Sequence, residues 1–266
     1  MKENHLILDF SHVYCDENIP ENALVNDNVH WLDCSQIEGC DLYCSECAEE
    51  KIMEKIEPYG IHGIHFLDSG NYHYITAIMV SQICEDFMLV VFDHHTDMQK
   101  PMIEDIMSCG DWAGKVLNTN PYLQQLVLIG PEQKDIKQIY SDKADELNGT
   151  YIKEKLLTFS AEEIESGGDK DNISKIKTDL PVYISIDKDI LDRKYSETNW
   201  SQGKMSLTML EELLLHFLQN RRILGIDICG ECQPGIPFPE YIEAEEINEE
   251  TNKELFEYLN HYINNL

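Results

Sequence analysis

Two segments of the chain place carboxylates and imidazoles directly after runs of apolar residues. The segment VVFDHHTD carries Asp93, His95 and Asp97, and the segment VYISIDKD carries Asp187 and Asp189. Alternate residues of an extended chain point to the same side, so the members of each set share one face. Either segment alone would also fit a solvated loop, a helix cap or a salt bridge. Both together, each after a buried strand, favour a functional cluster.

A cluster of this composition predicts a metal site. Several carboxylates gathered at adjacent strand ends cannot all stay ionised without a compensating cation. Carboxylates with a few imidazoles suit Mn²⁺, Mg²⁺ or similar ions better than a cysteine-rich zinc site would. Because carboxylates can bridge, such a set can hold two ions, which would acidify a shared water and deliver hydroxide at neutral pH.

The elements that must position these residues alternate along the chain. Buried apolar strands followed by helices predict an α/β fold of three layers, α/β/α, with a mainly parallel central sheet. In such sheets function lies at the carboxyl ends of the strands, where this chain carries Asp68, Asp93, Asp187 and Asp227. No linker or repeat divides residues 1–266, so we expect a single domain.

The expected strands are 5–10, 61–68, 87–93, 126–130, 182–187 and 223–229. The expected helices are 44–56, 74–83, 109–117, 206–218 and 253–266, and the stretch 132–179 is expected to form helices and loops. Thr208 and Glu211 have the spacing of a capping box at the start of the fourth of these helices.

Composition narrows the partners and the compartment. Fifty acidic and twenty basic residues give a net charge of -30 and a pI near 4.5. Nucleic acid and anionic membranes require basic surface and are not expected as partners. The charge would favour a cationic substrate by steering, but it fits equally an acidic surface that only keeps the protein soluble. The N-terminus has no signal-peptide pattern, and no apolar run approaches the roughly 20 residues of a membrane span. Nine cysteines, an odd number, fit the reducing cytoplasm better than a disulfide framework.

The motifs resemble those of the ureohydrolases, the family of arginase and agmatinase. The family has a Gly-Gly-Asp-His segment, an Asp-x-His-x-Asp and a Ser-x-Asp-x-Asp, and this chain reads SGNYH, DHHTD and SIDKD in the same order. The resemblance extends along most of the chain and implies an arginase-like fold, two metal ions, most often Mn²⁺, and the option of a homo-oligomer. One ion would be held by His73, Asp93, Asp97 and Asp187, and the other by His95, Asp93, Asp187 and Asp189. His94 is then not a ligand.

The resemblance also implies how the substrate is held. A family Glu in a Glu-x-x-Pro segment pairs with the guanidinium, and ECQP places Glu231 there; a carboxylate can accept two parallel N–H bonds from this planar cation. Asp227 is expected to support the metals or the pocket from further out. Asp97 is expected to relay the proton of the hydroxide.

Two departures from the family concern the reaction and its substrate. The family His that transfers a proton to the leaving amine is replaced by Cys109, which either takes part in proton transfer or only packs. The Pro- and Gly-rich loop of arginases is replaced by a segment with Tyr195, Asn199 and Trp200, which we expect to bind the substrate at a wider mouth. Small guanidino compounds and arginine within a peptide are both candidate substrates.

The predicted function is therefore binuclear, manganese-dependent hydrolysis of a guanidino or amidino group by a metal-bridging hydroxide, releasing urea and an amine. Two alternatives remain: a deacetylase-like amidohydrolase with one zinc ion, which His73 and Asp97 argue against, and a non-catalytic metal-binding relative. The spacing of the cysteines in CDLYCSEC also resembles the cluster-binding signature of radical S-adenosylmethionine enzymes, and a zinc site is another alternative to free thiols. These cysteines, with one upstream, are Cys34, Cys40, Cys44 and Cys47.

Overall fold

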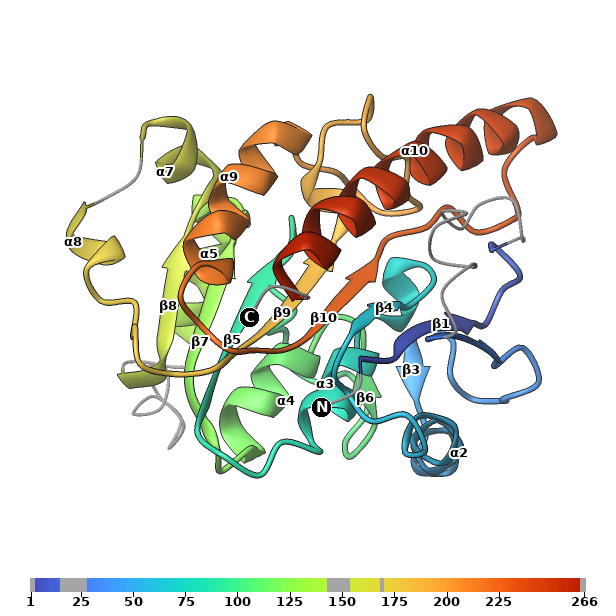
Figure 1. Cartoon of the computed structure of the whole chain (residues 1–266), viewed down its shortest axis with the longest axis horizontal. Coiled ribbons are helices and arrows are strands. Elements are labelled where there is room, and N and C mark those ends of the chain that lie inside the picture. The colour runs from blue at the N-terminus through green and yellow to red at the C-terminus, as the bar shows by residue number, and fades with distance from the viewer. Residues whose placement is uncertain (1–2, 15–27, 143–153, 168–169, 264–266) are drawn as a thin grey trace.

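The structure is a computed structural model that describes residues 3–14, 28–142, 154–167 and 170–263. Its centre is an eight-stranded sheet in the order β2-β1-β4-β10-β9-β5-β7-β8, in which each neighbouring pair is parallel. Figure 1 shows helices on both faces of this sheet, with α9 and α10 on one side and α3 and α4 on the other. The predicted three-layer α/β/α class is confirmed.

The strands of the central sheet are short and mostly buried. They are β1 (His5–Asp9), β2 (Val29–Asp33), β4 (Ile64–Phe66), β5 (Phe87–Phe92), β7 (Leu123–Ile129), β8 (Leu156–Phe159), β9 (Val182–Asp187) and β10 (Ile223–Cys229). A separate antiparallel pair is formed by β3 (Tyr43–Cys44) and β6 (Met107–Ser108).

The helices connect the strands and cover the sheet. They are α2 (Glu46–Ile56), α3 (Ile75–Val80), α4 (Trp112–Thr119), α5 (Gln133–Asp142), α7 (Ala161–Glu165), α8 (Lys170–Ile173), α9 (Leu207–Leu218) and α10 (Phe238–Ile263). Two short 3₁₀ helices, η1 (Gly70–Tyr72) and η2 (Lys188–Ile190), follow strands β4 and β9 and lie next to predicted metal ligands.

Each face of the sheet has its own hydrophobic core, which explains why the strands read as continuous apolar runs. Along β5, Leu89 and Val91 belong to the core beneath α3 and α4, whereas Met88 and Val90 belong to the core beneath α9 and α10. Burying each such side chain stabilises the fold by about 1.5–3 kcal/mol. The strand ends are therefore held in a rigid frame on both sides.

Element boundaries differ from the predictions where packing or capping decides. Strands β2 and β8 were not expected; β8 lies in the stretch for which helices and loops were predicted. Helix α10 begins at Phe238, well before the predicted start, and residues 264–266 of the prediction lie outside the described residues, as do 143–153 and 168–169 of the unassigned stretch. The predicted capping box is wrong, because Ser206 caps α9 by accepting from Met209 N.

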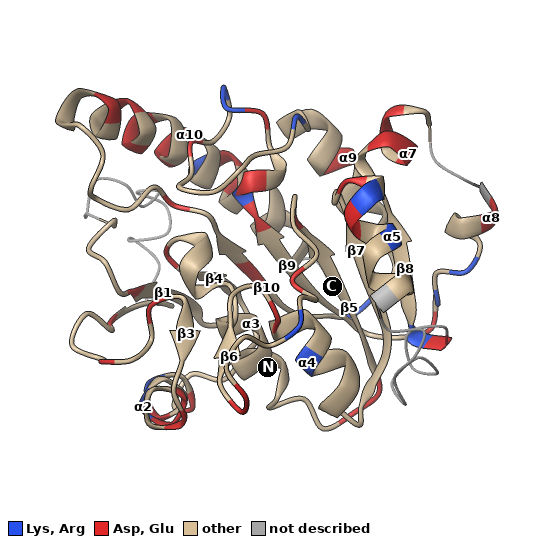
Figure 2. Cartoon of the chain, turned by 180° about the vertical axis from the view of Figure 1, so that it is seen from behind, with Lys and Arg blue, Asp and Glu red and all other residues tan. Residues whose placement is uncertain are grey.

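Charge is spread unevenly over the fold. Figure 2 shows acidic residues along α10 and α2 with few basic residues among them. Within the described part of the chain, no helix has the length and apolar character needed to cross a membrane.

Candidate metal centre

Neighbouring strands of the sheet bring the two acidic motifs together. Strands β5 and β9 are paired in parallel with Phe92 opposite Ile186. The next residues along each strand, Asp93 and Asp187, therefore emerge side by side at the carboxyl edge of the sheet. His73 arrives from another direction, at the end of η1, where the backbone turns after β4.

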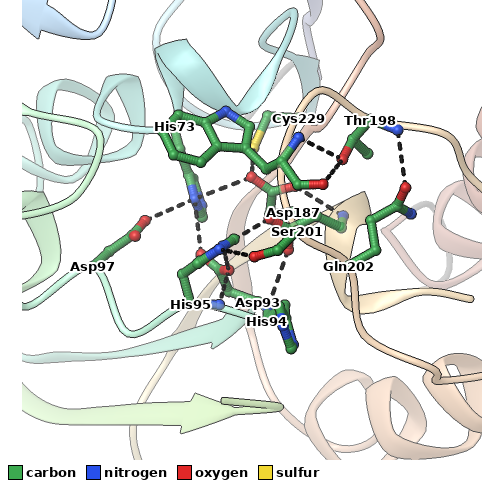
Figure 3. A network of polar contacts seen from close by, with 12 residues as sticks. His73, Asp93, His94, His95, Asp97, Asp187, Thr198, Ser201, Gln202 and Cys229 are labelled. Carbon is green, nitrogen blue, oxygen red and sulfur yellow. Dashed lines mark hydrogen bonds and ion pairs between the residues drawn. The ribbon is translucent and has the colours of Figure 1, made fainter. Parts of the chain in front are cut away.

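One group of ligands surrounds His73, and we call it the inner group. His73 Nδ1 lies 3.2 Å from Asp93 Oδ2, 3.1 Å from Asp97 Oδ2 and 3.6 Å from Asp187 Oδ2. The side chains of all four residues are almost fully buried. Figure 3 shows the imidazole pointing into the space between the carboxylates. One nitrogen and three oxygens thus converge as ligands of a single ion would.

A second group, the outer group, surrounds His95. His95 Nδ1 lies 2.8 Å from Asp189 Oδ2 and 3.5 Å from Asp93 Oδ1. Asp93 thus directs one carboxylate oxygen to each group and lies between them. The structure brings all six predicted metal ligands into one cluster: His73, Asp93, His95, Asp97, Asp187 and Asp189.

The pKa values of the clustered side chains indicate an excess of buried negative charge. Burial and the charge of Asp93 raise the pKa of Asp97 to about 7, and burial and the charge of Asp187 raise the pKa of Asp189 well above its usual range. Burial disfavours the charged form of His95, but hydrogen bonds with Asp189 and Asp93 outweigh it and raise the pKa of the imidazole to about 12. Divalent cations would neutralise this charge.

A buried polar atom supports the fit of a cation. Among the described residues, His73 Nδ1 makes no hydrogen bond of acceptable geometry, although the side chain is 1% exposed and this nitrogen lies 3.1 Å and 3.2 Å from the nearest carboxylate oxygens. Buried nitrogen atoms are rarely left without a partner. A lone pair on this nitrogen directed at an ion would satisfy it, so the donor set fits a metal.

The opposite nitrogen of each imidazole is held by a hydroxyl group. His73 Nε2 lies 2.9 Å from Ser185 Oγ, which lies 2.9 Å from Thr76 Oγ1, and His95 Nε2 lies 2.9 Å from Ser201 Oγ. Such contacts fix the tautomer and the orientation of a ligating imidazole. Sequence reasoning missed these roles, although Ser185 stands in the Ser-x-Asp-x-Asp motif itself.

Trp112 performs a similar role for Asp97. Its indole Nε1 donates to Asp97 Oδ2 at 2.5 Å, and its ring is fully buried at the start of α4. Asp97 itself has a φ of 47°, a backbone conformation in which Asp is tolerated better than bulky residues. The second carboxylate of the DHHTD segment is therefore held by its backbone and by a neighbouring helix.

The ligand cluster forms the floor of a cavity of about 220 Å³. Two of the predicted catalytic or substrate residues outside the ligand set, Trp200 and Cys109, line it together with the cation Lys100. Burial, and next the charge of Asp97, raise the pKa of the Cys109 thiol to about 12. The thiol therefore keeps its proton near neutral pH, and the lowered pKa that a role in proton transfer requires is not seen in the metal-free chain.

Two predicted substrate residues are directed elsewhere. Asn199 accepts a hydrogen bond from Gln233 N at 2.6 Å, and Tyr195 packs against the core beneath α9 and α10. Neither is among the described residues that line the cavity. These positions do not support the substrate role predicted for the two residues, because their side chains are engaged by Gln233 and by the core, although Trp200 of the same segment does line the cavity.

The predicted guanidinium-binding role of Glu231 does not agree with its position. The carboxylate is buried outside the cavity lining, where its Oε1 accepts from Lys188 Nζ at 2.6 Å and from Asn252 Nδ2 at 2.8 Å. Lys188 Nζ also donates to Asn252 Oδ1 at 2.8 Å. Because Lys188 lies between Asp187 and Asp189 in η2, this ion pair anchors the turn that presents two metal ligands.

Asp227 and His94 are likewise outside the ligand groups. Asp227 Oδ1 accepts from Tyr183 Oη at 2.7 Å and lies 2.8 Å from His65 Nδ1, in a buried network within the sheet. Its predicted support of the metals or pocket is therefore not seen. His94 enters the cluster through its backbone N–H, which donates to Asp189 Oδ1 at 3.1 Å.

The four N-terminal cysteines do not gather into a site. Cys47 is exposed, whereas the other three thiols are buried in the core beneath α3 and α4, to which α2 also contributes. Of the groups of possible metal ligands among the described residues, none contains these cysteines. Their free thiols agree with the reading in which they only pack. The cysteines concerned are Cys34, Cys40, Cys44 and Cys47.

Comparison with known proteins agrees with this geometry. A sequence model of the Arginase family matches residues 27–237. A protein of Thermotoga maritima, described only as an uncharacterized protein, is 30% identical over 259 residues, which cover 97% of this chain and 91% of that protein.

Similar solved structures include an arginase and a formiminoglutamase. The arginase of Entamoeba histolytica in complex with L-ornithine has a TM-score of 0.63 and 13% identity, covering 99% of this chain and 98% of that chain. The formiminoglutamase of Trypanosoma cruzi with Mn²⁺ has a TM-score of 0.60 and 13% identity, covering 98% of this chain and 94% of that chain. These likenesses show a common fold. With the family match over most of its length and the ligand motifs in the same order, the chain belongs to the Arginase family of ureohydrolases.

Proposed function

We propose that this protein is a binuclear metal-dependent hydrolase of guanidino or amidino groups, which releases urea or a related product and an amine. The observation that carries the proposal is the pair of ligand groups that share Asp93. A centre for a single ion would not need His73 with Asp97 and also His95 with Asp189. This argues against the deacetylase-like alternative.

The donor set indicates which ions the centre would hold. His73, Asp93, Asp97 and Asp187 would hold the inner ion, and His95, Asp189 and the bridging carboxylates Asp93 and Asp187 the outer one. Manganese is the first candidate, because carboxylate and imidazole donors suit it and a fold relative was solved with Mn²⁺. A pair of such ions would supply Lewis acidity and lower the pKa of a water molecule toward neutrality.

The residues of the cavity would handle the substrate and its protons. Water contributes the oxygen of urea, and the C–N bond to the substrate's tail breaks as the amine nitrogen gains a proton. Asp97, which lines the cavity beside His73, is placed to accept the proton of the water. Cys109 lines the cavity and is the candidate donor to the amine, because ions bound at the cluster would lower the pKa of its thiol.

The substrate is proposed to be cationic. The indole of Trp200 lines the wall of the cavity, where a guanidinium can lie against the ring. With Glu231 held by Lys188 and the carboxylates of the floor neutralised by the ions, recognition of the cation falls to this ring. A small guanidino compound and an arginine side chain of a peptide both fit this chemistry.

The eight described cysteines are all free, which agrees with a reducing cytoplasm.

A urea-release assay tests the proposal. Manganese-loaded protein is incubated with arginine, agmatine, guanidinobutyrate and arginine-containing peptides, and urea and bound metal are measured. We expect urea from at least one compound and two ions per chain in the unsubstituted protein. Asp187→Ala should lose both, whereas His94→Gln, whose side chain belongs to no ligand group, should keep both.

Two results would count against the proposal. Full metal content and activity in Asp187→Ala would refute the ligand assignment. Two bound ions without turnover of any guanidino or amidino compound would instead favour the non-catalytic alternative, for which the replacement of the family His by Cys109 is the motivating observation.

A further inference from the structure

A thiol lies against the inner group, and none of the roles described above involves it. Cys229, the last residue of β10, is 1% exposed, and its Sγ lies 3.2 Å from Asp187 Oδ2. Its sulfur, one nitrogen of His73 and one oxygen of Asp187 all lie within 4.8 Å of one another. Figure 3 shows the Cys229 thiol next to the Asp187 carboxylate.

The sheet determines this position. Strands β10 and β9 are paired in parallel, and Cys229 is the register partner of Asp187. The next residue, Gly230, has a φ of 97°, and a Cβ added there would lie 2.6 Å from Asp187 Oδ1. The chain therefore turns tightly around the Asp187 carboxylate, which holds the thiol close to it.

The surroundings of the thiol are those of a ligand. Leu224 and the isoleucines of β10 pack into the two cores, and Asp227 is bound by His65 and Tyr183. Cys229 borders the core beneath α3 and α4, and its thiol also faces Asp187 and His73 of the inner group. Within the described residues His73 Nδ1 makes no hydrogen bond of acceptable geometry. A cation bound between His73, Asp187 and Cys229 would satisfy this nitrogen. A sulfur atom at this point is a soft ligand among harder ones.

We propose that Cys229 binds the inner ion as a thiolate, so that the inner site has one nitrogen, three oxygen and one sulfur donors. This inference rests on the metal centre of the proposed function and concerns the identity of one ion. On binding, a sulfur–metal bond forms and the thiol proton passes to solvent, without any oxidation or reduction. Because thiolate favours softer ions, the inner site prefers Zn²⁺ or Co²⁺ to Mn²⁺, whereas the outer site has nitrogen and oxygen donors alone.

Cobalt spectroscopy tests the sulfur ligand directly. Metal-free protein is titrated with Co²⁺, and the near-ultraviolet sulfur-to-cobalt charge-transfer band is recorded. We expect the band in the unsubstituted protein and its loss in Cys229→Ser. The matched control is Cys232→Ser, a buried cysteine three residues further on that belongs to no ligand group among the described residues. Cys109→Ser controls for the thiol of the cavity wall, and both control variants should keep the band.

Metal competition provides a second measurement. The preference of the inner site for Zn²⁺ over Mn²⁺ should fall at least tenfold in Cys229→Ser. If that variant does not fold, X-ray absorption of the zinc-loaded unsubstituted protein still decides the matter, because a sulfur ligand scatters at about 2.3 Å from zinc. A spectrum with nitrogen and oxygen scatterers alone would overturn the proposal.

The outcomes separate this inference from the proposed function. Two bound cobalt ions without a sulfur band, or a band that survives in Cys229→Ser, would overturn the thiolate ligand and leave the binuclear centre standing. A single bound ion with the sulfur band would support Cys229 as a ligand and refute the binuclear centre. The stoichiometry and the band are thus independent readouts.

Discussion

Replacing Glu231 by Gln decides between two roles for this residue. In the role implied by family resemblance, the carboxylate binds the guanidinium, and its loss would weaken substrate binding. In the structure, the carboxylate is paired with Lys188, whose side chain is fully buried. Its loss should therefore destabilise the fold even when metal and substrate are absent.

The magnitude follows from the burial of the pair. The Lys188 Nζ to Glu231 Oε1 distance is 2.6 Å, and the two side chains are 0% and 7% exposed. Removing one partner of such a pair leaves an uncompensated buried charge, which costs about 3–5 kcal/mol. Gln is close to Glu in volume, so no cavity adds to this cost. At about 2–4 °C per kcal/mol for a chain near this length, the expected fall in Tm is roughly 6–20 °C.

Equilibrium urea unfolding of the metal-free protein measures the effect. Glu85→Gln is the matched control, because Glu85 pairs with Arg222 at the surface, where both side chains are about half exposed, and an exposed pair contributes at most about 1 kcal/mol. The double variant Lys188→Met/Glu231→Gln should lose less free energy of unfolding than the sum of the two single variants, by about 0.5–3 kcal/mol. An unchanged urea midpoint in Glu231→Gln, together with weaker binding of a guanidino ligand, would refute the structural role.

Four further predictions concern the centre and its cavity. Gly230→Ala should lower metal content at least tenfold at limiting metal, because its Cβ would lie 2.6 Å from Asp187 Oδ1; elemental analysis showing normal content would contradict this. Trp200→Ala should raise KM for a cationic substrate several-fold with a smaller change in kcat, which steady-state kinetics checks. Cys109→Ala should lower kcat about 10²-fold with metal content intact if the thiol donates the proton, and unchanged kcat would leave it a packing role. Since the pKa of His95 is raised to about 12, the metal-free protein holds this proton at pH 7. The stability gained from the protonated imidazole is complete below pH 6.5 and is lost as the pH rises toward 12. Because a metal ion must displace this proton, apparent metal affinity should rise with pH, and calorimetry in different buffers should detect the released proton.

Local patterns in the sequence were sufficient for the layers of the fold and for the acidic strand ends that meet in the cluster, whereas His73 was placed there by the family resemblance. Strands buried on both faces read as apolar runs, so β5, β9 and β10 were placed within a residue or two of their ends. The carboxyl-edge rule for parallel sheets brought Asp93 to Asp187. The alternation expected of extended segments was wrong, because Asp97 has a φ of 47° and Asp189 lies in the 3₁₀ helix η2. These inferences depend on neighbours along the chain, which a sequence displays directly.

Elements without a clear local signal were missed. Strand β8 has four residues and lies after a charged stretch, and α10 begins in a segment where acidic residues conceal its apolar face. The cap of α9 was assigned to the wrong residue because Ser206 and Thr208 are both acceptable caps, and the packing of the preceding segment decides which one has the extended backbone.

The types and order of the proposed metal ligands were thus determined by the sequence, because ligand chemistry is a property of the side chains and strand ends are marked by the residues before them. The partner of each remaining charged or polar group was decided by tertiary structure. Glu231 could face a cavity or a lysine, and only the folding of α10 against η2 brought Asn252 and Lys188 to it. Cys229 met Asp187 through the register of two strands far apart in the chain. Contacts of this kind depend on distances through space, which no spacing along the chain encodes.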